Sequence, residues 1–524
     1  MLSVGVVTWW NVLAIPDPSG ATLWSTLAPY PDEQPALAAP ERPPLNFAGL
    51  RRLIGDTVGT LNGLGIGRGG RVAIVLPNGP EMAAAFLAIG AGAATAPLNP
   101  AYREDEFDFY LSDLEPRALV LGAGMESPAR AIANRRGIPI IELVSEPDQP
   151  AGSFRLQIDG AAGAPEPGGM AEPDDVALLL HTSGTTSRPK LVPLSQRNIM
   201  ASARHIGATL ALTAADRCLN IMPLFHIHGL IGAVLSSLAA GGSVFCTPGF
   251  NALRFFAWLE EAAPSWYSAV PTMHQTILAR AERNREAIER RKLRFIRSSS
   301  ASLPPPVMAE LEQTFGCPVV ESYGMTEASH QMTSNPLPPR PRKPGTVGPA
   351  AGPEVAVLDE AGKRAPAGAT GEVAIRGPNV TAGYVANPTA NATAFTDGWF
   401  RTGDQGVLDA DGYLTITGRL KELINRGGEK ISPREVDDLL MTHPAVAQAV
   451  TFALPHDKLG EEVAAAIVLR EGRTATEREL RDFVSTRLAD FKVPRKVVFL
   501  AEIPKGATGK LQRIGLAAKL GLTA

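Results

Sequence analysis

The sequence predicts an α/β fold in which helix-covered parallel sheets are followed by an antiparallel β subdomain and a small α+β domain. Over most of the chain, short apolar segments alternate with helical segments, which is typical of parallel sheets covered by helices. After about residue 346, short strand patterns separated by turns indicate an antiparallel arrangement. The final part of the chain, from about residue 420, has a strand and helix pattern of its own.

In the N-terminal part, residues 71–77 and 118–121 predict buried strands, and residues 81–94 predict a helix. The alanine- and glycine-rich stretch 82–97 as a whole has the composition of buried helix. A strand followed by a helix is predicted again later in the chain. A short strand at 265–270 precedes a long helix at 271–291, which starts with a proline. Residues 161–173 are rich in glycine and proline and predict a loop before a buried strand at 174–180.

The C-terminal part starts a separate unit, which divides the chain into residues 1–419 and 420–524. Ser432, with Glu435 three residues later, predicts a capping box at the start of a helix over 433–442. The remaining predicted elements are strands at 355–358, 371–375, 413–416, 446–453 and 462–469, and a helix at 474–488.

Composition places the chain among globular proteins and excludes several classes. Hydrophobic residues make up 45% and charged residues 20% of the 524 residues. The balance of 53 acidic and 50 basic side chains gives no reason to expect a nucleic-acid surface. Three cysteines, none in a CxxC pair, cannot form a disulfide framework and argue for a reducing compartment and against a thiolate metal site.

The termini favour a cytoplasmic protein without stable membrane insertion. Residues 1–16 are mostly apolar, but no lysine or arginine precedes Arg42, and a signal peptide needs a basic start. The apolar run is also too short to span a bilayer. The last four residues, GLTA, are not a peroxisomal address.

A loop rich in hydroxyl groups follows the predicted strand at 174–180. Its sequence, HTSGTTSRPK at residues 181–190, combines a glycine with hydroxyl donors and two cations. Glycine lets backbone N–H groups turn toward an anion, while serine and threonine add donors and lysine adds charge. A β-turn rich in serine and threonine is the alternative for such a composition, and the common GxxxxGK[ST] phosphate loop is absent. The candidate nucleotide ligands are Thr182, Ser183, Gly184, Thr185, Thr186 and Lys190.

Five further motifs follow in order. YGMTE at 323–327 places an aromatic face, a hydroxyl and a carboxylate within five residues, which suits a magnesium nucleotide. GWFRTGD at 398–404 ends in a carboxylate that is suited to two vicinal hydroxyls, and GRLKE follows at 418–422. NRGGEKISP at 425–433 is rich in glycine, and PKGATGK occupies 504–510. Each motif alone is ambiguous, because lone lysines and arginines are usually solvated surface charges.

Together and in this order, these motifs resemble the adenylate-forming superfamily of acyl-CoA synthetases, luciferases and peptide-synthetase adenylation domains. The resemblance extends over about residues 43–512, and the phosphate loop differs at Ser187 and Leu191, where the family usually has glycine. It implies a large N-terminal domain of two βα sheets plus a β subdomain, and a small mobile α+β C-terminal domain. It also implies ATP, Mg²⁺ and coenzyme A as cofactor and cosubstrates, and a small-molecule carboxylic acid as substrate. A monomer or homodimer is expected, although the sequence does not determine the oligomeric state.

The resemblance assigns roles to individual residues. Tyr323 would stack on adenine, Thr326 would contact the α-phosphate, Glu327 would bind Mg²⁺, and Asp404 with Arg419 would hold the ribose. Further nucleotide contacts are expected at Ser300, Ala301, Gly324 and Met325. Lys421 would be the hinge, Lys510 the catalytic lysine, and Gly427, Gly428 and Lys430 would line the CoA channel.

The implied reaction has two steps. A carboxylate reacts poorly with a thiol, because its oxygen is a poor leaving group. Attack of the carboxylate on the α-phosphorus of ATP gives a mixed anhydride and releases pyrophosphate, and CoA then displaces AMP. Two anions meet in the first step, so cations must neutralise the site.

Three segments near the expected acyl pocket, 223–229, 297–302 and 328–330, indicate a small and polar acid. Ser299 and Ser300 stand where the superfamily usually has glycine and alanine, which narrows the site and argues against a fatty-acid tunnel. Hydroxyl and imidazole groups suit a second carboxylate, with His228 or His330 expected to bind it as imidazolium.

Four strings resemble oxalate–CoA ligases more narrowly: 181–190, PLFHIHGL at 223–230, TMHQ at 272–275 and MTEASHQM at 325–332. The resemblance implies that His228, Ser300 and His330 hold the distal carboxylate. His226 would occupy the gate position of the superfamily. For each histidine, a hydrogen-bonded core residue is the alternative.

Other functions remain open at this point. The same chemistry on malonate would favour an arginine at the distal carboxylate, and Arg297 is then a candidate; an aryl acid or a medium-chain fatty acid is also possible. Adenylation for a carrier protein would need a separate carrier, because only 14 residues follow Lys510. A non-catalytic scaffold is disfavoured by the presence of Lys510, Glu327 and Asp404.

Overall fold

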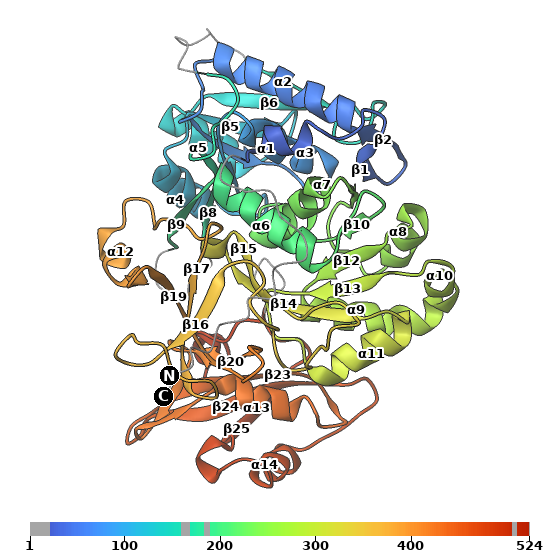
Figure 1. Ribbon diagram of the computed structural model, residues 1–524. Coiled ribbons are helices and arrows are strands. Elements are labelled where there is room, and N and C mark those ends of the chain that lie inside the picture. Colours follow the sequence, from blue (N-terminus) through green and yellow to red (C-terminus); the bar gives the residue numbers. More distant parts are fainter. Residues whose placement is uncertain (1–20, 159–167, 183–188, 506–510, 523–524) are drawn as a thin grey trace, which may run out of the picture.

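The computed structural model describes residues 21–158, 168–182, 189–505 and 511–522. Within these residues the strands form four sheets. Two large sheets have seven and eight strands, and two smaller sheets have five strands each. In Figure 1, the seven-stranded sheet lies near the blue end of the chain, the eight-stranded sheet lies below it with one smaller sheet beside it, and the C-terminal sheet lies at the bottom. This arrangement confirms the predicted α/β fold with two βα sheets, a β subdomain and a small α+β C-terminal part.

The seven-stranded sheet is buried on both faces, which is why its inner strands are apolar throughout. Along β3 (Arg71–Val75), Val72 and Ile74 pack on one face with α3 (Pro80–Gly90), and Ala73 and Val75 pack on the other with α4 and α5. The strand order is β7 (Phe154–Gln157), β6 (Ile140–Ser145), β5 (Ala118–Gly122), β3, β4 (Ala94–Pro97), β8 (Val176–His181) and β9 (Leu191–Ser195), and the helices are α2 (Phe47–Gly63), α3, α4 (Glu104–Leu114), α5 (Pro128–Arg136) and α6 (Gln196–Thr209).

The eight-stranded sheet is built in the same way, and its carboxyl-terminal edge carries most of the candidate acid-binding residues. Its order is β15 (His330–Ser334), β14 (Val319–Met325), β13 (Phe295–Ser298), β12 (Trp266–Ala269), β10 (Arg217–Asn220), β11 (Ser243–Cys246), β1 (Pro35–Ala39) and β2 (Arg42–Asn46). The associated helices are η2 (His228–Leu235), α7 (Ser236–Ala239), α8 (Phe255–Ala262), α9 (Pro271–Ala281), η3 (Glu282–Asn284), α10 (Arg285–Arg290) and α11 (Pro305–Phe315), with α1 (Leu23–Leu27) near the start of the chain.

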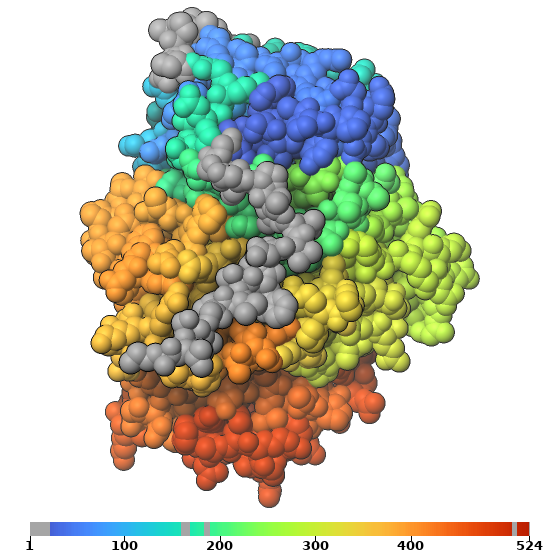
Figure 2. All heavy atoms as spheres, viewed as in Figure 1, coloured from blue at the N-terminus to red at the C-terminus, as the bar shows by residue number. Residues whose placement is uncertain are grey.

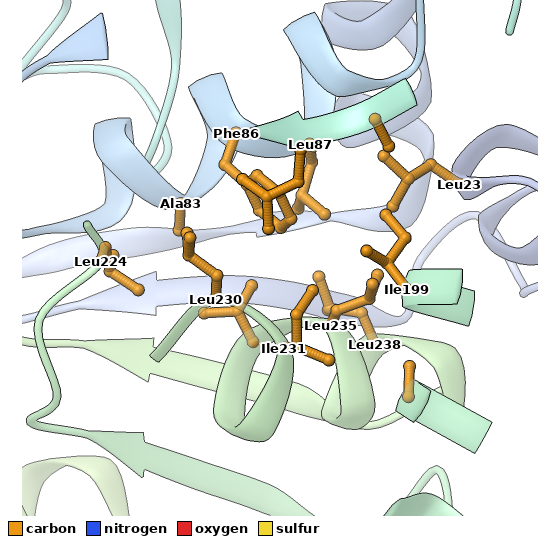
Figure 3. Packing of buried hydrophobic residues seen from close by; sticks show 14 of the residues in the cluster. Leu23, Ala83, Phe86, Leu87, Ile199, Leu224, Leu230, Ile231, Leu235 and Leu238 are labelled. Carbon is orange, nitrogen blue, oxygen red and sulfur yellow. The ribbon is translucent and has the colours of Figure 1, made fainter. Parts of the chain in front are cut away.

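The main hydrophobic core lies between these two sheets. Figure 3 shows Phe86 and Leu87 of α3 facing Leu230 and Ile231 of η2. All four side chains are fully buried, and burial of each such side chain contributes about 1.5–3 kcal/mol. The core therefore holds η2, and with it His228, against both sheets.

The β subdomain and the C-terminal sheet are mainly antiparallel. In the latter, Gly427 and Gly428 form the two-residue turn of a hairpin, with backbone φ of 60° and 97° that glycine adopts readily. The subdomain contains β16 (Glu354–Leu358), β17 (Thr370–Arg376), β18 (Phe395–Thr396), β19 (Trp399–Leu408) and β20 (Leu414–Arg419), with α12 (Pro388–Ala394). The C-terminal sheet contains β21 (Ile424–Arg426), β22 (Glu429–Ile431), β23 (Val446–His456), β24 (Gly460–Leu469) and β25 (Lys496–Phe499), with α13 (Pro433–Leu440), α14 (Glu477–Ser485), η5 (Asp490–Lys492) and α15 (Leu516–Lys519).

The C-terminal part packs directly against the larger part, as the red and orange surface in Figure 2 shows. Gln275 of α9 donates from Nε2 to the carbonyl oxygen of Ala447 at 3.1 Å. Glu321 of β14 is buried within the electrostatic reach of Arg434 on α13. No helix among the described residues is long and apolar enough to cross a membrane. The division of the chain at residue 419 stays a prediction.

Three local predictions are wrong. The stretch 82–97 is not one helix, because α3 ends at Gly90 and β4 follows at Ala94–Pro97. The long helix at 271–291 is divided, because the 3₁₀ turn η3 separates α9 from α10. The capping box at α13 does not form: the Ser432 hydroxyl instead donates to the Thr417 carbonyl oxygen, and Glu435 pairs with Lys492 at 2.7 Å. Tertiary partners compete successfully with the local cap.

Candidate active site

The base of the phosphate loop lies at the ends of β8 and β9. The backbone N–H of Thr182 donates to the carbonyl oxygen of Lys190 at 2.9 Å, and the backbone N–H of Lys190 donates to Thr182 Oγ1 at 3.2 Å. These bonds hold Lys190 at the start of β9. Five predicted site residues lie outside the described residues, and they are Ser183, Gly184, Thr185, Thr186 and Lys510.

Lys190 lies in a small group of charges. Its Nζ is 4.4 Å from the centroid of the Tyr384 ring, and burial lowers the pKa of its ammonium. Lys421, the predicted hinge, also lowers this pKa by repulsion, while Glu327 raises it. Two lysines thus converge beside one carboxylate, which is an arrangement suited to a polyphosphate.

Glu327 is held in η4 (Thr326–Ala328), directly after β14. Its side chain is buried, and Tyr384 donates to Glu327 Oε1 at 2.8 Å. Burial raises the pKa of Glu327, whereas the bond from Tyr384 and the charge of Lys190 lower it. Sequence reasoning missed Tyr384, which lies 57 positions away in a segment without a recognised motif.

The donor set near Glu327 fits magnesium held mainly by a nucleotide. Among the described residues there is no group of three or more histidine, cysteine, aspartate or glutamate side chains that could hold a metal ion. Mg²⁺ commonly uses one or two protein carboxylates together with substrate phosphates and water. One buried carboxylate beside two lysines therefore suits this ion.

Asp404 forms a clamp with the two residues predicted to surround the nucleoside. Arg419 donates from Nε to Asp404 Oδ1 at 2.8 Å, and the Tyr323 hydroxyl donates to Asp404 Oδ2. The pairing of β19 with β20 fixes this geometry, because Asp404 and Arg419 are direct cross-strand partners. Gly324 and Met325 follow Tyr323 at the end of β14.

The candidate acid-binding residues converge around His228, which is fully buried at the start of η2. Its Nδ1 lies 3.0 Å from Ser300 Oγ, and its Nε2 lies 2.6 Å from Ser268 Oγ. Both hydroxyls can accept, so the two ring nitrogens of His228 can both carry protons. Ser268 on β12 was not identified from the sequence.

His330 stacks on His228 with ring centroids 4.9 Å apart and an angle of 23° between the planes. Arg297 Nη1 lies 2.9 Å from His330 Nε2, and Arg297 Nη2 donates to Gln331 Oε1 at 3.2 Å. A guanidinium has no acceptor, so Nε2 of His330 must accept. This geometry contradicts the expected imidazolium form of His330, whereas His228 retains that possibility.

Arg297 is a buried cation. The guanidinium is fully buried, burial lowers its pKa to about 9, and its Nε has no hydrogen-bond partner among the described residues. Within the same part of the chain, no carboxylate forms a salt bridge with it. A buried guanidinium of this kind is costly unless a negative charge approaches it.

Strained backbone occurs at the candidate acid-binding cluster, as it does at six other non-glycine positions among the described residues. Ser300, Ser329 and His330 have φ of 73°, 50° and 98°, in the region that non-glycine residues rarely adopt. Such strain persists only where the surroundings enforce it, and it is common at binding sites. A Cβ at Gly232 of η2 would lie 2.7 Å from the His330 ring, so this glycine lets the helix approach the histidine pair.

The remaining predicted residues lie around this centre. His226 is half-buried, and its Nδ1 accepts from the backbone N–H of His228 at 3.3 Å. Ala301 is exposed next to Ser300. Gly427, Gly428 and Lys430 belong to the exposed β21–β22 hairpin of the C-terminal sheet, where the Gly427 N–H donates to the Leu459 carbonyl oxygen at 2.8 Å.

The fold and the arrangement of these groups suit an enzyme that uses a nucleotide to activate an acid. The chain belongs to the AMP-binding enzyme family, which matches residues 24–385, and the AMP-binding enzyme C-terminal domain matches residues 435–510. The protein is an AMP-forming acid–CoA ligase with ATP, CoA and a carboxylic acid as substrates.

Three known proteins illustrate the similarity. The chain is 46% identical to an oxalate–CoA ligase of Arabidopsis thaliana, covering 92% of this chain and 95% of the relative. It is 45% identical to an oxalate–CoA ligase of Saccharomyces cerevisiae, covering 84% and 85%. The crystal structure of ATP-bound MatB from Rhodopseudomonas palustris superposes with a TM-score of 0.83 at 31% identity, covering 94% of this chain and 97% of that one.

Proposed function

We propose that the acid activated by this enzyme is oxalate, with ATP and Mg²⁺ in the first step and CoA in the second. The observation that carries the proposal is the buried polar cluster of His228, Ser300, His330 and Arg297. These groups offer hydroxyl and imidazole hydrogen bonds beside a buried cation. Oxalate is a short dianion, and its second carboxylate needs such donors and such a charge.

Electrostatics favours a dianion over a monoanion at this site. The guanidinium of Arg297 is fully buried and has no carboxylate partner among the described residues. One carboxylate of the acid must be directed to the phosphorus, so a monocarboxylic acid brings no further charge to the cluster. A second carboxylate would compensate the buried cation, and the compensation is strong because the surroundings have a low dielectric constant.

The dimensions of the cluster favour a short acid. The stacked rings of His228 and His330 lie directly against η2, where even one extra carbon at Gly232 would collide with them. The long apolar side chains of η2 are committed to the core between the sheets. A long acyl chain would therefore have to displace packed side chains. The named activity of the two oxalate–CoA ligases supports the same choice.

We assign the nucleotide to the region of Lys190, Glu327 and Asp404, beside the acid-binding cluster. The adenylation step brings a carboxylate to the α-phosphate, and Lys190, Lys421 and the predicted Lys510 would lower the repulsion between these anions. Glu327, positioned by Tyr384, would bind Mg²⁺, which when bound neutralises phosphate charge. Asp404 and Arg419 would hold the ribose hydroxyls, and Tyr323 would face the adenine.

In the second step, the CoA thiol attacks the acyl carbon and AMP leaves. We propose that the C-terminal part rotates about Lys421 between the steps, which moves Lys510 away and brings the Gly427–Gly428 turn toward the acyl group. The exposed position of this hairpin is compatible with such a rotation. A cytoplasmic location and a monomeric or homodimeric state stay predictions.

The proposal is tested by identifying the products. Purified enzyme is incubated with oxalate, Mg-ATP and CoA, and the products are identified by mass spectrometry. Oxalyl-CoA and AMP in equal amounts are the expected result. Without CoA, the enzyme should retain oxalyl-adenylate and release one equivalent of pyrophosphate. Pyrophosphate release that does not depend on oxalate would refute the assignment.

Malonate is the second candidate, and Arg297 is the observation that favours it. A buried arginine beside the distal carboxylate is what the sequence argument required for malonate, and this arginine reaches the cluster through His330. The groups that line the cluster beside His330 are hydroxyl and imidazole groups, however, and Arg297 lies behind them. The relative kcat/KM for oxalate and malonate separates the two candidates.

A further inference from the structure

The proposed oxalate site contains a chain of hydrogen bonds that continues behind the residues expected to touch the acid. The Gln331 amide donates to Thr209 Oγ1 at 3.1 Å and to the Ala351 carbonyl oxygen at 3.0 Å. Because both amide protons are used, its Oε1 faces Arg297 and accepts from Nη2 at 3.2 Å. The guanidinium is thereby fixed in orientation, with Nη1 directed at His330 Nε2.

This orientation decides where the proton of His330 lies. Arginine offers donors only, so the His330 Nε2 atom, 2.9 Å from Nη1, contributes its lone pair. A neutral imidazole has one N–H, and it must then be on Nδ1. Protonation of Nε2 would break the bond to Arg297 and place a second positive charge against a buried cation.

His228, which stacks on His330, is not restricted to one protonation state. Both nitrogens of His228 face serine hydroxyls, at 3.0 Å for Ser300 and 2.6 Å for Ser268. A hydroxyl accepts from an imidazolium or donates to a neutral ring, so His228 can adopt either charge state. The two histidines of the pair are therefore not equivalent, although they look alike in the sequence.

We infer that Arg297 is a positioning residue for oxalate: it fixes His330 as a neutral donor through Nδ1–H and adds a buried positive charge behind that donor. Gln331 orients Arg297 in turn. This assignment rests on the proposed oxalate specificity, and it adds the residue that distinguishes a dianionic acid from an isosteric monoanion. Arg297 acts through His330, so its effect should fall on acid selection and not on the use of ATP.

The direct test of the tautomer uses nitrogen NMR of the wild-type enzyme. Protein labelled with ¹⁵N in the imidazole rings of its 8 histidines is recorded between pH 6 and 9, and His330→Asn identifies the His330 signals. We expect protonated Nδ1 and unprotonated Nε2 across this range. In Arg297→Met, His330 should no longer be restricted to the form with a protonated Nδ1 and an unprotonated Nε2. A protonated Nε2 in the wild-type enzyme would overturn the inference.

The kinetic test compares oxalate with oxamate, in which an uncharged amide replaces one carboxylate. We expect Arg297→Met to lower kcat/KM for oxalate roughly 10- to 100-fold, mainly through KM, and to lower the value for oxamate much less. The KM for ATP should not change. Arg297→Lys keeps the charge and should retain most of the preference for oxalate over oxamate.

The outcomes separate the two proposals. If the wild-type enzyme does not use oxalate, the proposed function fails, while the NMR experiment still decides the tautomer. If the wild-type enzyme uses oxalate and Arg297→Met lowers activity equally for both acids, or raises the KM for ATP to the same extent, only the inference about Arg297 fails. Should Arg297→Met not fold, Arg297→Lys and the wild-type NMR spectrum still test it.

Discussion

Gly232→Ala probes how closely helix η2 approaches the histidine pair. The new Cβ would lie 2.7 Å from Cδ2 and Nε2 of His330 and 3.2 Å from Cδ2 of His228. Ordinary carbon contacts are about 3.5–4.0 Å, so the His330 ring must move by about 1 Å. His330 has little freedom to do so, because its backbone φ is 98° and Arg297 holds its Nε2 atom.

A displacement of about 1 Å at a positioning group can reduce activity about 100-fold, which corresponds to about 2.7 kcal/mol. We therefore expect kcat/KM for oxalate to fall about 100-fold in Gly232→Ala, with an unchanged KM for ATP. The assay is pyrophosphate release at varied oxalate with saturating Mg-ATP and CoA.

Gly59→Ala is the matched control. Gly59 lies in the middle of α2, and a Cβ there meets nothing within 4 Å. This variant should keep full activity and gain about 0.5–1 kcal/mol in stability, because alanine is the better helix former. If Gly232→Ala retained a kcat/KM for oxalate within about threefold of the wild-type value, the close packing of η2 against the site would not govern acid binding.

Three further predictions concern other parts of the molecule. Burial raises the pKa of the Glu321 carboxyl group from 4.5 to about 7, so the folded protein binds the carboxyl proton more tightly than the unfolded chain does. The protonated carboxyl group therefore contributes about 3 kcal/mol to the free energy of unfolding below pH 4.5, and this contribution is lost as the pH rises to 7. Urea unfolding of Glu321→Gln should lack this decline, and an unchanged pH dependence relative to wild type would contradict the assignment. Tyr384→Phe removes a hydrogen bond to Glu327 and should raise the KM for Mg-ATP roughly 10-fold without affecting the KM for oxalate; equal changes in both would argue against a role at the nucleotide. Lys510→Ala should cost roughly 3–4 kcal/mol in adenylation but spare thioester formation from preformed oxalyl-adenylate, and equal losses in both steps would exclude its assigned role.

Much of the fold is predictable from the sequence because its strands are short apolar runs bounded by proline and glycine. β3, β5 and β12 lie where these patterns place them. The pattern fails at residues 82–97, where small apolar residues suit a buried helix and a buried strand equally well. It also fails at Ser432, because the carbonyl oxygen of Thr417 on the neighbouring strand binds the hydroxyl that would have capped α13.

The site is only partly predictable, because its contacts join distant segments. Motifs indicate His228, Ser300 and His330, and the structure places these three together, although their roles stay predictions. Ser268 and Tyr384 cannot be identified from the sequence, because their partners are distant along the chain. Ser268 lies 40 positions from His228, and Tyr384 lies 57 positions from Glu327. Local periodicity carries no information about such pairs.

The tautomer of His330 is a further property that residue types alone do not determine. Sequence reasoning treats His228 and His330 as interchangeable imidazolium candidates. The distinction arises from the neighbours of each ring, which are serine hydroxyls for His228 and a guanidinium for His330. Only three-dimensional placement reveals that one ring is restricted to a single protonation state and the other is not.

The most direct test of the account is pyrophosphate release with Mg-ATP and CoA, measured for oxalate, malonate, acetate, 4-coumarate and octanoate. The buried cluster around His228 and Arg297 predicts a kcat/KM for oxalate well above that for every other acid in the panel. Acetate should be poor because it lacks the second carboxylate, and octanoate because it is long and apolar. A preference for 4-coumarate or octanoate would leave the ligase chemistry intact but contradict the assignment of the cluster to a small dianion.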